Sequence, residues 1–352
     1  MIVHAADAHL GVTRYQRIDT ETGLNVRMMD FCNAFDHLVS QVLEIRPDAF
    51  VFSGDLFDRV NPTNFIRKFA QDELKQLSSH NINTFLIPGN HETPRSKGVK
   101  NPLSLYLDIP YIHVGLEPFQ KDVGPYTIAG VPFSQDPVQY IPSPKEGRIN
   151  ILMLHAVVEG AVWGSERFME YIDETVKPGM VPPYTYCALG HIHRHQALSN
   201  MVYSGSLERY DFNEKDEKKG FVVYDDDYDF VTIPSRDMID VEYTCTGKTA
   251  FEIMEESVSL LKDLQDRIVR LTLRGELEPA TRKDINFTLI REKAQEALHF
   301  TLKDSTMAEE IEEIKEEEVL YSPQEELKRY LEAAKEEDAL PEGLTIIKEI
   351  LG

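Results

Sequence analysis

Cysteine is scarce in this chain of 352 residues, which contains only three. Cys32, Cys187 and Cys245 stand far apart, without the close spacing that disulfide frameworks or thiolate zinc sites show. This pattern argues against a disulfide-stapled secreted domain and against a zinc site built from thiolates. A reducing cytoplasm is the compartment that fits best.

Long apolar runs are absent as well. No stretch approaches the roughly 18 apolar residues that a membrane span requires. The first apolar run, residues 2–6, is too short for the hydrophobic region of a signal peptide and leads directly into Asp7, a candidate functional residue. We therefore expect a soluble globular protein with no membrane partner.

Basic residues are outnumbered, with 37 Lys and Arg against 60 Asp and Glu, and the formal net charge is −23. Residues 304–352 hold 16 acidic and 5 basic residues, or −11, which is nearly half of the excess. A surface for a polyanion would therefore have to be local. Two groups of basic residues could provide it, with ordinary solvated surface as the alternative: Arg14, Arg17 and Arg27, and then Arg95, Lys97 and Lys100.

The first 235 residues alternate strand-like runs with helix-like stretches. Helices are expected at about 29–44 and 65–78, and the later part is rich in strands, with runs at 126–131, 201–204 and 220–224. This order predicts an α/β fold, a mixed α/β sandwich. The helix near 65–78 could support a homodimer, although an apolar stripe of this kind more often belongs to a core.

The organisation changes near Pro234. A small α/β unit is expected over residues 238–303, with strands at 241–244 and 268–273 and helical stretches at about 249–263 and 284–297. The acidic segment 304–352 comes next, and it contains a helix start at Ser322-Pro323. Near its end, four apolar residues recur at helical spacing and would dock on a partner or fold back on the body: Ile346, Ile347, Ile350 and Leu351.

Five apolar runs, each typical of a buried strand, end in residues that can bind a metal ion. The run at 2–6 leads into Asp7 and His9, and the run at 50–53 leads into Asp55. The run at 84–87 leads into Asn90, His91 and Glu92. The runs at 151–154 and 187–189 lead into His155 and into the pair His191 and His193. In open α/β sheets, functional groups gather beyond the carboxyl ends of the strands. The repeated placement predicts one site assembled from distant parts of the chain.

The candidate ligands combine carboxylates, an amide oxygen and imidazoles: Asp7, His9, Asp55, Asn90, His155, His191 and His193. This mixture suits manganese, iron or zinc rather than calcium, which takes oxygen donors alone. Seven ligands exceed what one tetrahedral ion needs and suit two ions that share a carboxylate, an arrangement that hydrolyses phosphate esters.

Local geometry supports this grouping in two ways. Residues i and i+2 of an extended strand point the same way, so Asp7 with His9, and His191 with His193, can each face one locus. Glycines beside the ligands suit tight turns or close backbone approach: Gly54, Gly89 and Gly190. The remaining histidines lack such company and are expected to be ordinary surface or core residues: His4, His37, His80, His113, His195 and His299. Among these, His195 is the weakest case because it comes after His193 at strand spacing.

Taken in order over residues 7–193, the motifs Asp-x-His, Gly-Asp, Gly-Asn-His-Glu, His and Gly-His-x-His resemble the calcineurin-like metallophosphoesterase superfamily. Three further stretches resemble its SbcD family: His9-Leu10-Gly11, Gly54-Asp55-Leu56-Phe57-Asp58, and Tyr203-Ser204-Gly205-Ser206-Leu207-Glu208-Arg209 followed by Asp211-Phe212. That family is the nuclease subunit of the DNA double-strand-break repair complex, known in archaea and eukaryotes as the meiotic-recombination nuclease.

The resemblance implies a four-layer α/β/β/α sandwich over residues 1–235, a DNA-capping domain over 238–303 and an ATPase-binding helical segment over 304–352. It also implies that one ion is held by Asp7, His9, Asp55 and His193, and the other by Asp55, Asn90, His155 and His191. Asp55 would bridge the two ions. His91 would be catalytic, acting on the scissile phosphate or on the leaving oxygen.

One departure from the family pattern concerns Asp58. Many members carry a histidine shortly after Gly-Asp-Leu-Phe, and that histidine assists exonuclease action. Asp58 stands at this position here, so it is a candidate for catalytic assistance, and the handling of duplex ends is expected to differ.

The expected function is a two-metal, manganese-dependent DNA exonuclease and endonuclease that works with an SbcC-type coiled-coil ATPase. Two alternatives stay open from the residues alone. A phosphoesterase for a different phosphodiester or for a phosphoprotein would lack the 238–303 unit and the partner-binding tail. A mainly scaffolding repair subunit with structural metals would have no evident need for His91.

Overall fold

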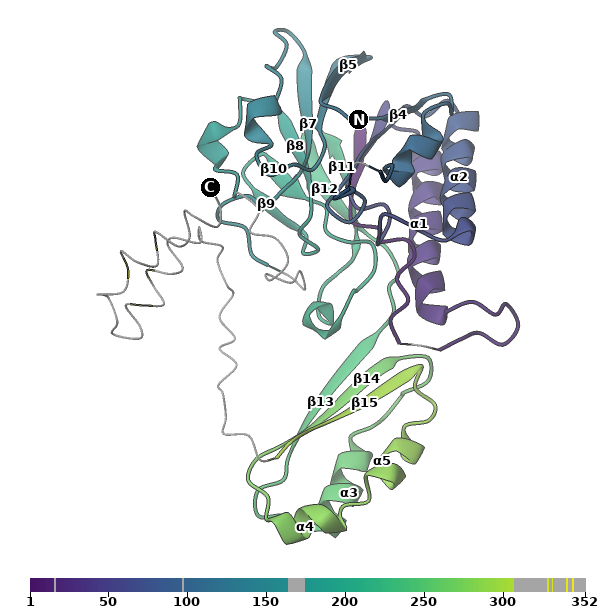
Figure 1. The fold of residues 1–352 in the computed structure, drawn as a ribbon, viewed down its shortest axis with the longest axis vertical. Helices are drawn as coiled ribbons and strands as arrows, with labels where there is room; N and C mark the ends of the chain where they lie inside the picture. The colour runs from purple at the N-terminus through teal and green to yellow at the C-terminus, as the bar shows by residue number, and fades with distance from the viewer. Residues whose placement is uncertain are drawn as a thin grey trace.

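The computed structural model describes residues 1–306, except Gln16, Lys97 and residues 164–174, together with Lys328, Leu331, Leu340 and Leu344 (Figure 1). Those four later positions are helical, and Leu331 is buried. The rest of the acidic segment, including the apolar residues at 346–351, lies outside the described residues.

The first sheet has six strands in the order β12-β11-β1-β2-β3-β4. Four of them run parallel, namely β1 (Ile2–Ala5), β2 (Ala49–Ser53), β3 (Thr84–Ile87) and β4 (Ile112–Val114). A hairpin of β11 (Gly220–Asp225) and β12 (Asp227–Thr232) joins antiparallel to β1. Asp226, with φ of 70°, turns this hairpin between the paired strand ends Asp225 and Asp227.

The second sheet also has six strands, in the order β5-β6-β7-β8-β10-β9. Its parallel strands are β6 (Tyr126–Val131), β7 (Ile149–His155), β8 (Tyr186–Gly190) and β10 (Met201–Tyr203). The antiparallel edge strands are β5 (Phe119–Val123) and β9 (Gln196–Leu198).

The two sheets pack face to face through a buried apolar layer. Val51 and Phe85 of the first sheet belong to the same cluster as Ile151 and Met153 of the second, and all four are fully buried. Burying several such side chains stabilises the sandwich by roughly 1.5–3 kcal/mol each.

Helices α1 (Val26–Ile45) and α2 (Asn64–Ser79) cover the other face of the first sheet (Figure 1). Asn25 and Thr63 cap them by accepting hydrogen bonds from backbone N–H groups in the first turn. The other face of the second sheet is covered by the segment after β7, which contributes Val157, Val158 and Tyr184 to a second core. The predicted mixed α/β sandwich is confirmed.

Short 3-10 helices complete this part: η1 (Pro102–Tyr106), η2 (Val138–Tyr140), η3 (Pro178–Met180) and η4 (Phe212–Glu214). Among the described residues, no helix has both the length and the apolar character that crossing a membrane would require.

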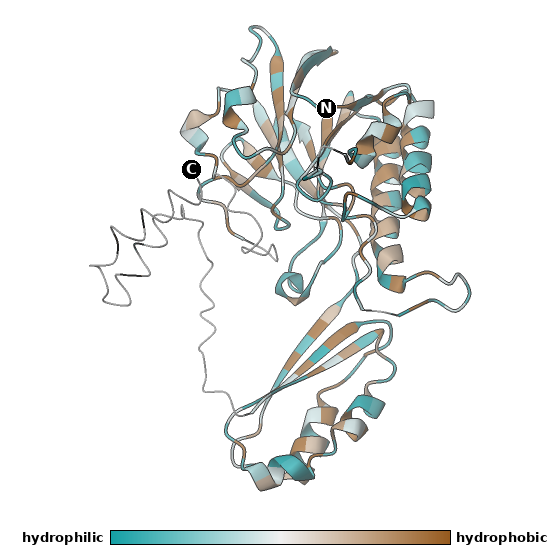
Figure 2. Ribbon diagram, in the orientation of Figure 1, coloured by the Kyte–Doolittle hydropathy of each residue, from teal (hydrophilic) through white to brown (hydrophobic). Residues whose placement is uncertain are grey.

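A separate three-stranded sheet comes after the sandwich. Strands β13 (Met238–Thr244), β14 (Ile268–Arg274) and β15 (His299–Ser305) are parallel, and helices α3 (Ala250–Ser259), α4 (Pro279–Asp284) and α5 (Phe287–Lys293) lie on one side of the sheet (Figure 1). Hydrophobic and hydrophilic residues alternate along the strands, as a half-buried sheet requires (Figure 2).

Two details of this unit differ from the sequence-based expectation. The helical stretch expected at about 284–297 is present as the shorter helix α5, which Asn286 caps by accepting from Leu289 N at 3.1 Å, and the short helix α4 before it was not expected. Strand β15 is an addition to the expected strands. Its side chains are mostly half-buried, so the run carries a weak apolar signal.

The junction between the sandwich and this unit is polar. Arg236 reaches back to α1, where its Nε and Nη2 donate to Asp30 at 2.6 and 2.5 Å, and its backbone N–H donates to Glu208 at 2.9 Å. Arg27 is fully buried in the same network and bonds to Asp30 at 3.0 Å. Arg27 is therefore a structural residue, and the interpretation of it as part of a polyanion-binding surface is wrong.

Candidate metal centre

All five sequence motifs emerge at the carboxyl ends of parallel strands: β1, β2 and β3 of one sheet, and β7 and β8 of the other. Since the sheets pack face to face, these ends meet at one edge of the sandwich. The predicted convergence of distant motifs is what the fold produces.

The sequence predicts that Asp7 with His9, and His191 with His193, face the site because side chains alternate along an extended strand. This explanation is wrong, since these residues lie beyond the strand ends. Strand β1 ends at Ala5, and the backbone then enters the left-handed region, with φ of 54° at Asp7 and 43° at His9. Strand β8 ends at Gly190, and His191 has φ of 98°. Such conformations cost about 1–3 kcal/mol each and cluster at functional sites, because they aim side chains that regular structure could not aim.

Three glycines allow the motif loops to approach one another. A Cβ atom on Gly54 would lie 2.2 Å from Nδ1 of His155, and one on Gly89 would lie 2.1 Å from Oδ1 of Asp55. A Cβ atom on Gly190 would lie 2.0 Å from the carbonyl oxygen of Ser53. No side chain fits at these distances, so glycine is required at each position.

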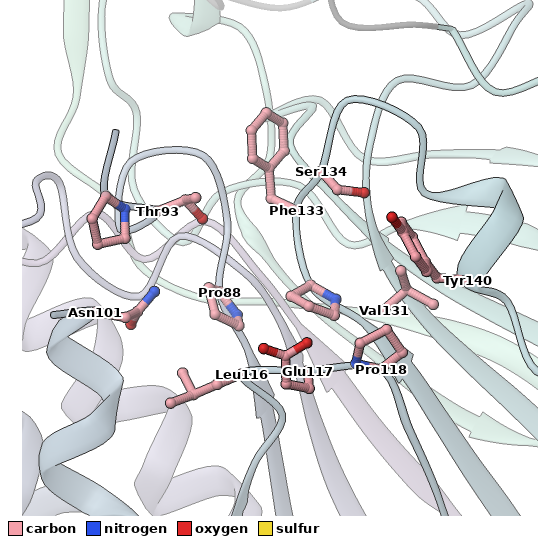
Figure 3. Close-up of a pocket in the computed structure, with 12 residues that line it drawn as sticks. Pro88, Thr93, Asn101, Leu116, Glu117, Pro118, Val131, Phe133, Ser134 and Tyr140 are labelled. Atoms are coloured by element: carbon pink, nitrogen blue, oxygen red, sulfur yellow. The ribbon is translucent and has the colours of Figure 1, made fainter. Parts of the chain in front are cut away.

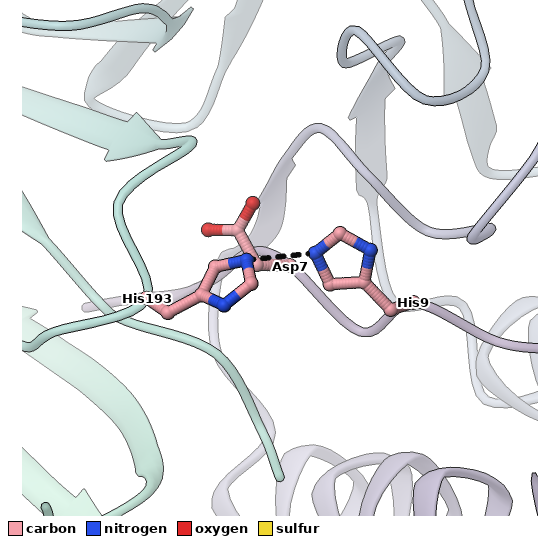
Figure 4. Close-up of side chains that lie close together, drawn as sticks. All are labelled: Asp7, His9 and His193. Atoms are coloured by element: carbon pink, nitrogen blue, oxygen red, sulfur yellow. Dashed lines mark hydrogen bonds between the residues drawn. The ribbon is translucent and has the colours of Figure 1, made fainter. Parts of the chain in front are cut away.

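Asp7, His9 and His193 form one half of the site (Figure 4). Nε2 of His9 lies 2.9 Å from Nε2 of His193. The other ring nitrogen of His193, Nδ1, lies 2.9 Å from Oε1 of Glu214, so it carries the proton and Nε2 presents a lone pair to the site.

Asn90, His155 and His191 form the other half. Nδ1 of His155 donates to the carbonyl oxygen of Ser53 at 2.8 Å, which turns its Nε2 toward the site. This Nε2 lies 2.9 Å from Oδ1 of Asn90 and 3.3 Å from Nδ1 of His191. Nδ1 of His191 lies 3.0 Å from the same amide oxygen.

Asp55 lies between the two halves. Its Oδ2 is 3.4 Å from Nε2 of His155 on one side and 4.0 Å from Nε2 of His9 on the other. Its Oδ1 accepts from the backbone N–H of His91 at 3.0 Å, which fixes the carboxylate. The carboxylate therefore faces both groups of imidazoles.

The donor set fits divalent metal ions. Ligand atoms of Asp7, His9 and His193, and separately of Asp7, Asp55 and His155, all lie within 4.8 Å of one another. Nδ1 of His9 is buried without a hydrogen-bond partner. Imidazole nitrogens that face each other at 2.9 Å need a shared proton or a cation, and carboxylates with imidazoles suit a borderline divalent ion.

The buried charges of this cluster perturb one another. Burial raises the pKa of Asp7 to about 6, although His155 and His193 oppose the rise. Burial also favours a higher pKa at Asp55, but His155 and His91 outweigh it and hold the pKa of that carboxyl below its usual range. Burial lowers the pKa of His191 to about 3, which keeps this imidazole neutral and able to coordinate a metal.

His91 is more exposed than the candidate ligands His9 and His155. Its Nδ1 donates to the carbonyl oxygen of Asp58 at 2.9 Å, and its Nε2 is 4.0 Å from Oδ2 of Asp55. Its side chain is 35% exposed, whereas those of His9 and His155 are at most 1% exposed. Such an imidazole can reach a substrate in solution.

Asp58 lies beside the site. Its Oδ1 accepts from the hydroxyl of Tyr210 at 3.0 Å and lies 3.8 Å from Nδ1 of His9. Ligand atoms of His9, Asp58 and His91 also fall within 4.8 Å of one another. Asp58 is thus within reach of the site, and its catalytic assistance stays a prediction.

Two supporting carboxylates, Glu92 and Glu214, were not among the seven predicted ligands. Glu92 is fully buried and accepts from Phe57 N at 2.7 Å and Gly89 N at 3.0 Å, so it ties two motif loops together. Because Glu92 ends the Gly-Asn-His-Glu motif, its supporting role could have been suspected from the sequence. Glu214, which holds His193, lies beyond the five motifs and carried no signal.

Two histidines outside the site behave as expected. His4 is buried and bonds to the hydroxyl of Tyr186 and the carbonyl oxygen of Leu189. His195 stacks on Phe230 with ring centroids 4.0 Å apart and bonds to the Tyr203 carbonyl oxygen at 2.8 Å. Strand spacing from His193 did not bring His195 into the site.

A cavity of about 390 Å³ opens next to the Asn90 half of the site (Figure 3). Pro88 and Thr93 line it from the loop that carries Asn90, and Phe133 and Tyr140 line it from the segment after β6. The Phe133 ring lies 6.2 Å from that of His155. The lining is mainly apolar and aromatic, and it adjoins the candidate ligands.

Two of the predicted basic residues have defined contacts, and one of them, Arg14, lies near the site. The guanidinium of Arg14 sits 4.0 Å above the ring of Tyr210. Arg17 donates to the carbonyl oxygen of Ala297 at 3.0 Å, so it joins the sandwich to the three-stranded unit.

Comparison with known proteins agrees with this geometry. Residues 1–195 match the family model of calcineurin-like phosphoesterases. A protein of Methanocaldococcus jannaschii named DNA double-strand break repair protein Mre11 is 30% identical over 69% of this chain and 67% of its own length. Proteins of the same name are 30% identical in Saccharolobus solfataricus and 27% in Methanosarcina mazei, over 56% and 89% of this chain.

The alignments cover about half of the length of the last two relatives, 50% and 51%. The matched region contains the five motifs and their shared edge of the sandwich. The chain therefore belongs to the calcineurin-like phosphoesterase family, as a metal-dependent phosphodiesterase of the Mre11/SbcD type.

Proposed function

We propose that this protein is a two-metal DNA nuclease of double-strand-break repair. The observation that carries the proposal is the position of Asp55 between two groups of imidazoles, 3.4 Å from His155 and 4.0 Å from His9. A carboxylate in that position can serve two ions at once. The relatives named as double-strand break repair proteins support DNA as the substrate.

The ligands divide between the two ions. Asp7, His9, Asp55 and His193 would hold one, and Asp55, Asn90, His155 and His191 the other. The short contacts within each group support this division, since His9 meets His193 at 2.9 Å and Asn90 meets His155 at 2.9 Å. Manganese is the ion we favour, because mixed carboxylate and imidazole ligands suit a borderline divalent cation.

Two divalent ions at such a site activate a water and neutralise the charge of a phosphodiester. The chain itself supplies His91. Its Nδ1 proton is held by the Asp58 carbonyl oxygen, which directs the exposed Nε2 to the substrate side. In the imidazolium form, with a second proton on Nε2, the ring can donate a hydrogen bond or that proton to a phosphate or leaving oxygen and return to the neutral Nδ1–H form. The backbone carbonyl of residue 58 sets this orientation, and the Asp58 carboxylate is the group we propose for catalytic assistance.

The parts outside the site have proposed partners. Residues 1–235 would form the nuclease domain and residues 238–303 would cap the DNA. Residues 304–352 would bind an SbcC-type coiled-coil ATPase, and two copies of the chain would form a homodimer. The separate sheet of β13, β14 and β15 and the length of the matches support a unit beyond the phosphoesterase sandwich.

Cleavage assays test the proposal. Labelled single-stranded and double-stranded DNA, with free and blocked ends, would be incubated with the full chain and manganese, with Asp55→Asn as the inactive control. We expect manganese-dependent cleavage that the control lacks. Hydrolysis of bis(p-nitrophenyl) phosphate without cleavage of any DNA substrate would point to a different phosphodiester and overturn the proposal.

A further inference from the structure

A buried ion pair lies directly behind the candidate ligand His193. Glu214 and Lys219 are both inaccessible to solvent, and Nζ of Lys219 is 2.6 Å from Oε2 of Glu214. Burying two charges costs several kcal/mol per ion, and a pair of apolar side chains would often serve stability as well or better. The placement of this pair therefore calls for a role other than packing.

The two oxygens of Glu214 face different neighbours. Oε1 accepts from Nδ1 of His193 at 2.9 Å, while Oε2 accepts from the backbone N–H of Tyr210 at 2.9 Å in addition to Lys219. Local structure fixes this arrangement, because Glu214 ends the 3-10 helix η4, which Asp211 caps by accepting from Asn213 N at 2.9 Å. The carboxylate cannot rotate without breaking these contacts.

Lys219 reaches the same histidine from its backbone side. Its Nζ donates to the carbonyl oxygen of His193 at 3.1 Å and to Oε2 of Glu217 at 2.8 Å. The N–H of Ser206 also donates to that carbonyl, at 3.0 Å. The close approach needs a glycine, since a Cβ atom on Gly205 would lie 2.6 Å from the His193 oxygen. The ring and the backbone of His193 are both held.

We propose that Glu214 and Lys219 form a positioning pair that fixes the tautomer and ring orientation of His193 for metal binding. The inference rests on the proposed function, because it takes His193 as a ligand. A carboxylate that accepts from Nδ1–H leaves the Nε2 lone pair for the metal and makes the imidazole a stronger donor. The ammonium group of Lys219, 2.6 Å from Oε2 of Glu214, offsets the negative charge of this buried carboxylate.

Manganese binding to the full chain tests the pair. Loss of such an outer partner weakens metal binding by about 10- to 100-fold, so we expect Glu214→Ala to lower the affinity for one of two ions by that amount. Glu214→Gln keeps an oxygen that can accept from His193 but removes the negative charge, and it should lower the same manganese affinity by at least about threefold. The matched control is Glu217→Gln, which removes the charge of a Lys219 partner that does not touch His193 and should leave both affinities near wild type.

A second readout monitors the histidine itself. Nitrogen-15 shifts of His193 should report a proton on Nδ1 in the wild type and a mixture of tautomers in Glu214→Ala. Should Glu214→Ala fail to fold with Lys219 left unpaired, the double change Glu214→Met with Lys219→Met removes both charges and should fold, with the same loss of metal affinity.

The outcomes separate the two proposals. If His193→Ala retains both ions, His193 is not a ligand and the proposed two-metal division fails. If His193→Ala loses an ion while the Glu214 variants keep wild-type affinity and the Nδ1 tautomer, the positioning pair is overturned and the metal site stands.

Discussion

The hydroxyl of Tyr210 donates a 3.0 Å hydrogen bond to Oδ1 of Asp58, across 152 residues of sequence. The ring of Tyr210 lies 5.3 Å from that of His9 and 5.6 Å from that of His193, and the Arg14 guanidinium covers it. Asp58 is thus tied to a wall of the site, at the position where the family pattern led us to expect a histidine.

Replacing Asp58 with histidine is expected to increase exonuclease activity on duplex ends, by roughly tenfold or more if the new imidazole acts as a general acid or hydrogen-bond donor to phosphate. A carboxylate repels a phosphate, whereas an imidazole does not. End-labelled duplex degradation with manganese measures the change. Tyr210→Phe is the control, since it frees Asp58 without changing the charge and should give no gain. An unchanged or lower rate in Asp58→His would mean that other residues compensate for the departure.

His91→Ala should keep both ions and DNA affinity and lose cleavage by about 100-fold or more, because its exposed Nε2 serves the substrate. Manganese content, DNA binding and single-turnover cleavage separate these effects. His80→Ala, a change at an exposed histidine on the far end of α2, is the matched control. Loss of manganese from the His91 variant would instead make His91 a ligand.

Asp55→Ala should reduce the binding of both ions, whereas Asn90→Ala should reduce the binding of one. The reason is that the Asp55 carboxylate faces His9 and His155, while the Asn90 amide oxygen faces only His155 and His191 among the candidate ligands. Equilibrium dialysis with manganese gives the stoichiometry. Near-normal content and rate in Asp55→Ala would refute the bridging role.

Glu73 on α2 provides a stability prediction away from the site. Burial, together with Asp36 and Asp72, raises the pKa of Glu73 to about 7. The folded protein therefore binds a proton on the Glu73 carboxyl group more tightly than the unfolded chain does. The stability that this protonation contributes is present below about pH 4.5 and is lost as the pH rises through about 7.

Glu73→Gln should consequently stabilise the protein at pH 8 by about 1–2 kcal/mol, a figure reduced for screening by water, and have little effect at pH 4.5. Urea unfolding at both pH values measures the free energy of unfolding. Glu44→Gln, at an exposed carboxylate of α1, should change it by less than about 0.5 kcal/mol at either pH. Equal effects of Glu73→Gln at pH 4.5 and 8 would show that ionisation of the Glu73 carboxyl group does not destabilise the folded protein.

Deletion of residues 322–352 should abolish co-purification with the ATPase and leave manganese-dependent cleavage of single-stranded DNA intact. The apolar stripe at 346–351 is about two turns long, too short to be a stable helix alone in water, so a partner is expected to hold it. Circular dichroism checks that the truncated chain folds. Unfolding, or loss of basal cleavage, would assign the tail to the core.

The identity of the site could be predicted from the sequence because it depends on residue type and order. Apolar runs that each end in Asp, Asn or His specify strands and the polar groups at their carboxyl ends, and strand ends in a parallel sheet share an edge. The need for glycine at Gly54, Gly89 and Gly190 was visible for the same reason, since each lies next to a ligand in the chain.

The direction in which each ligand side chain points was decided only by the tertiary structure. Asp7, His9 and His191 point into the site through left-handed backbone conformations that no apolar pattern encodes. Glu214 holds His193 across 21 residues, Tyr210 holds Asp58 across 152, and Arg27 is withdrawn into a junction with Asp30 and Glu208. Hydrogen bonds and burial of this kind form between segments that meet only after folding, so local sequence determined which groups are present and packing determined what each one does.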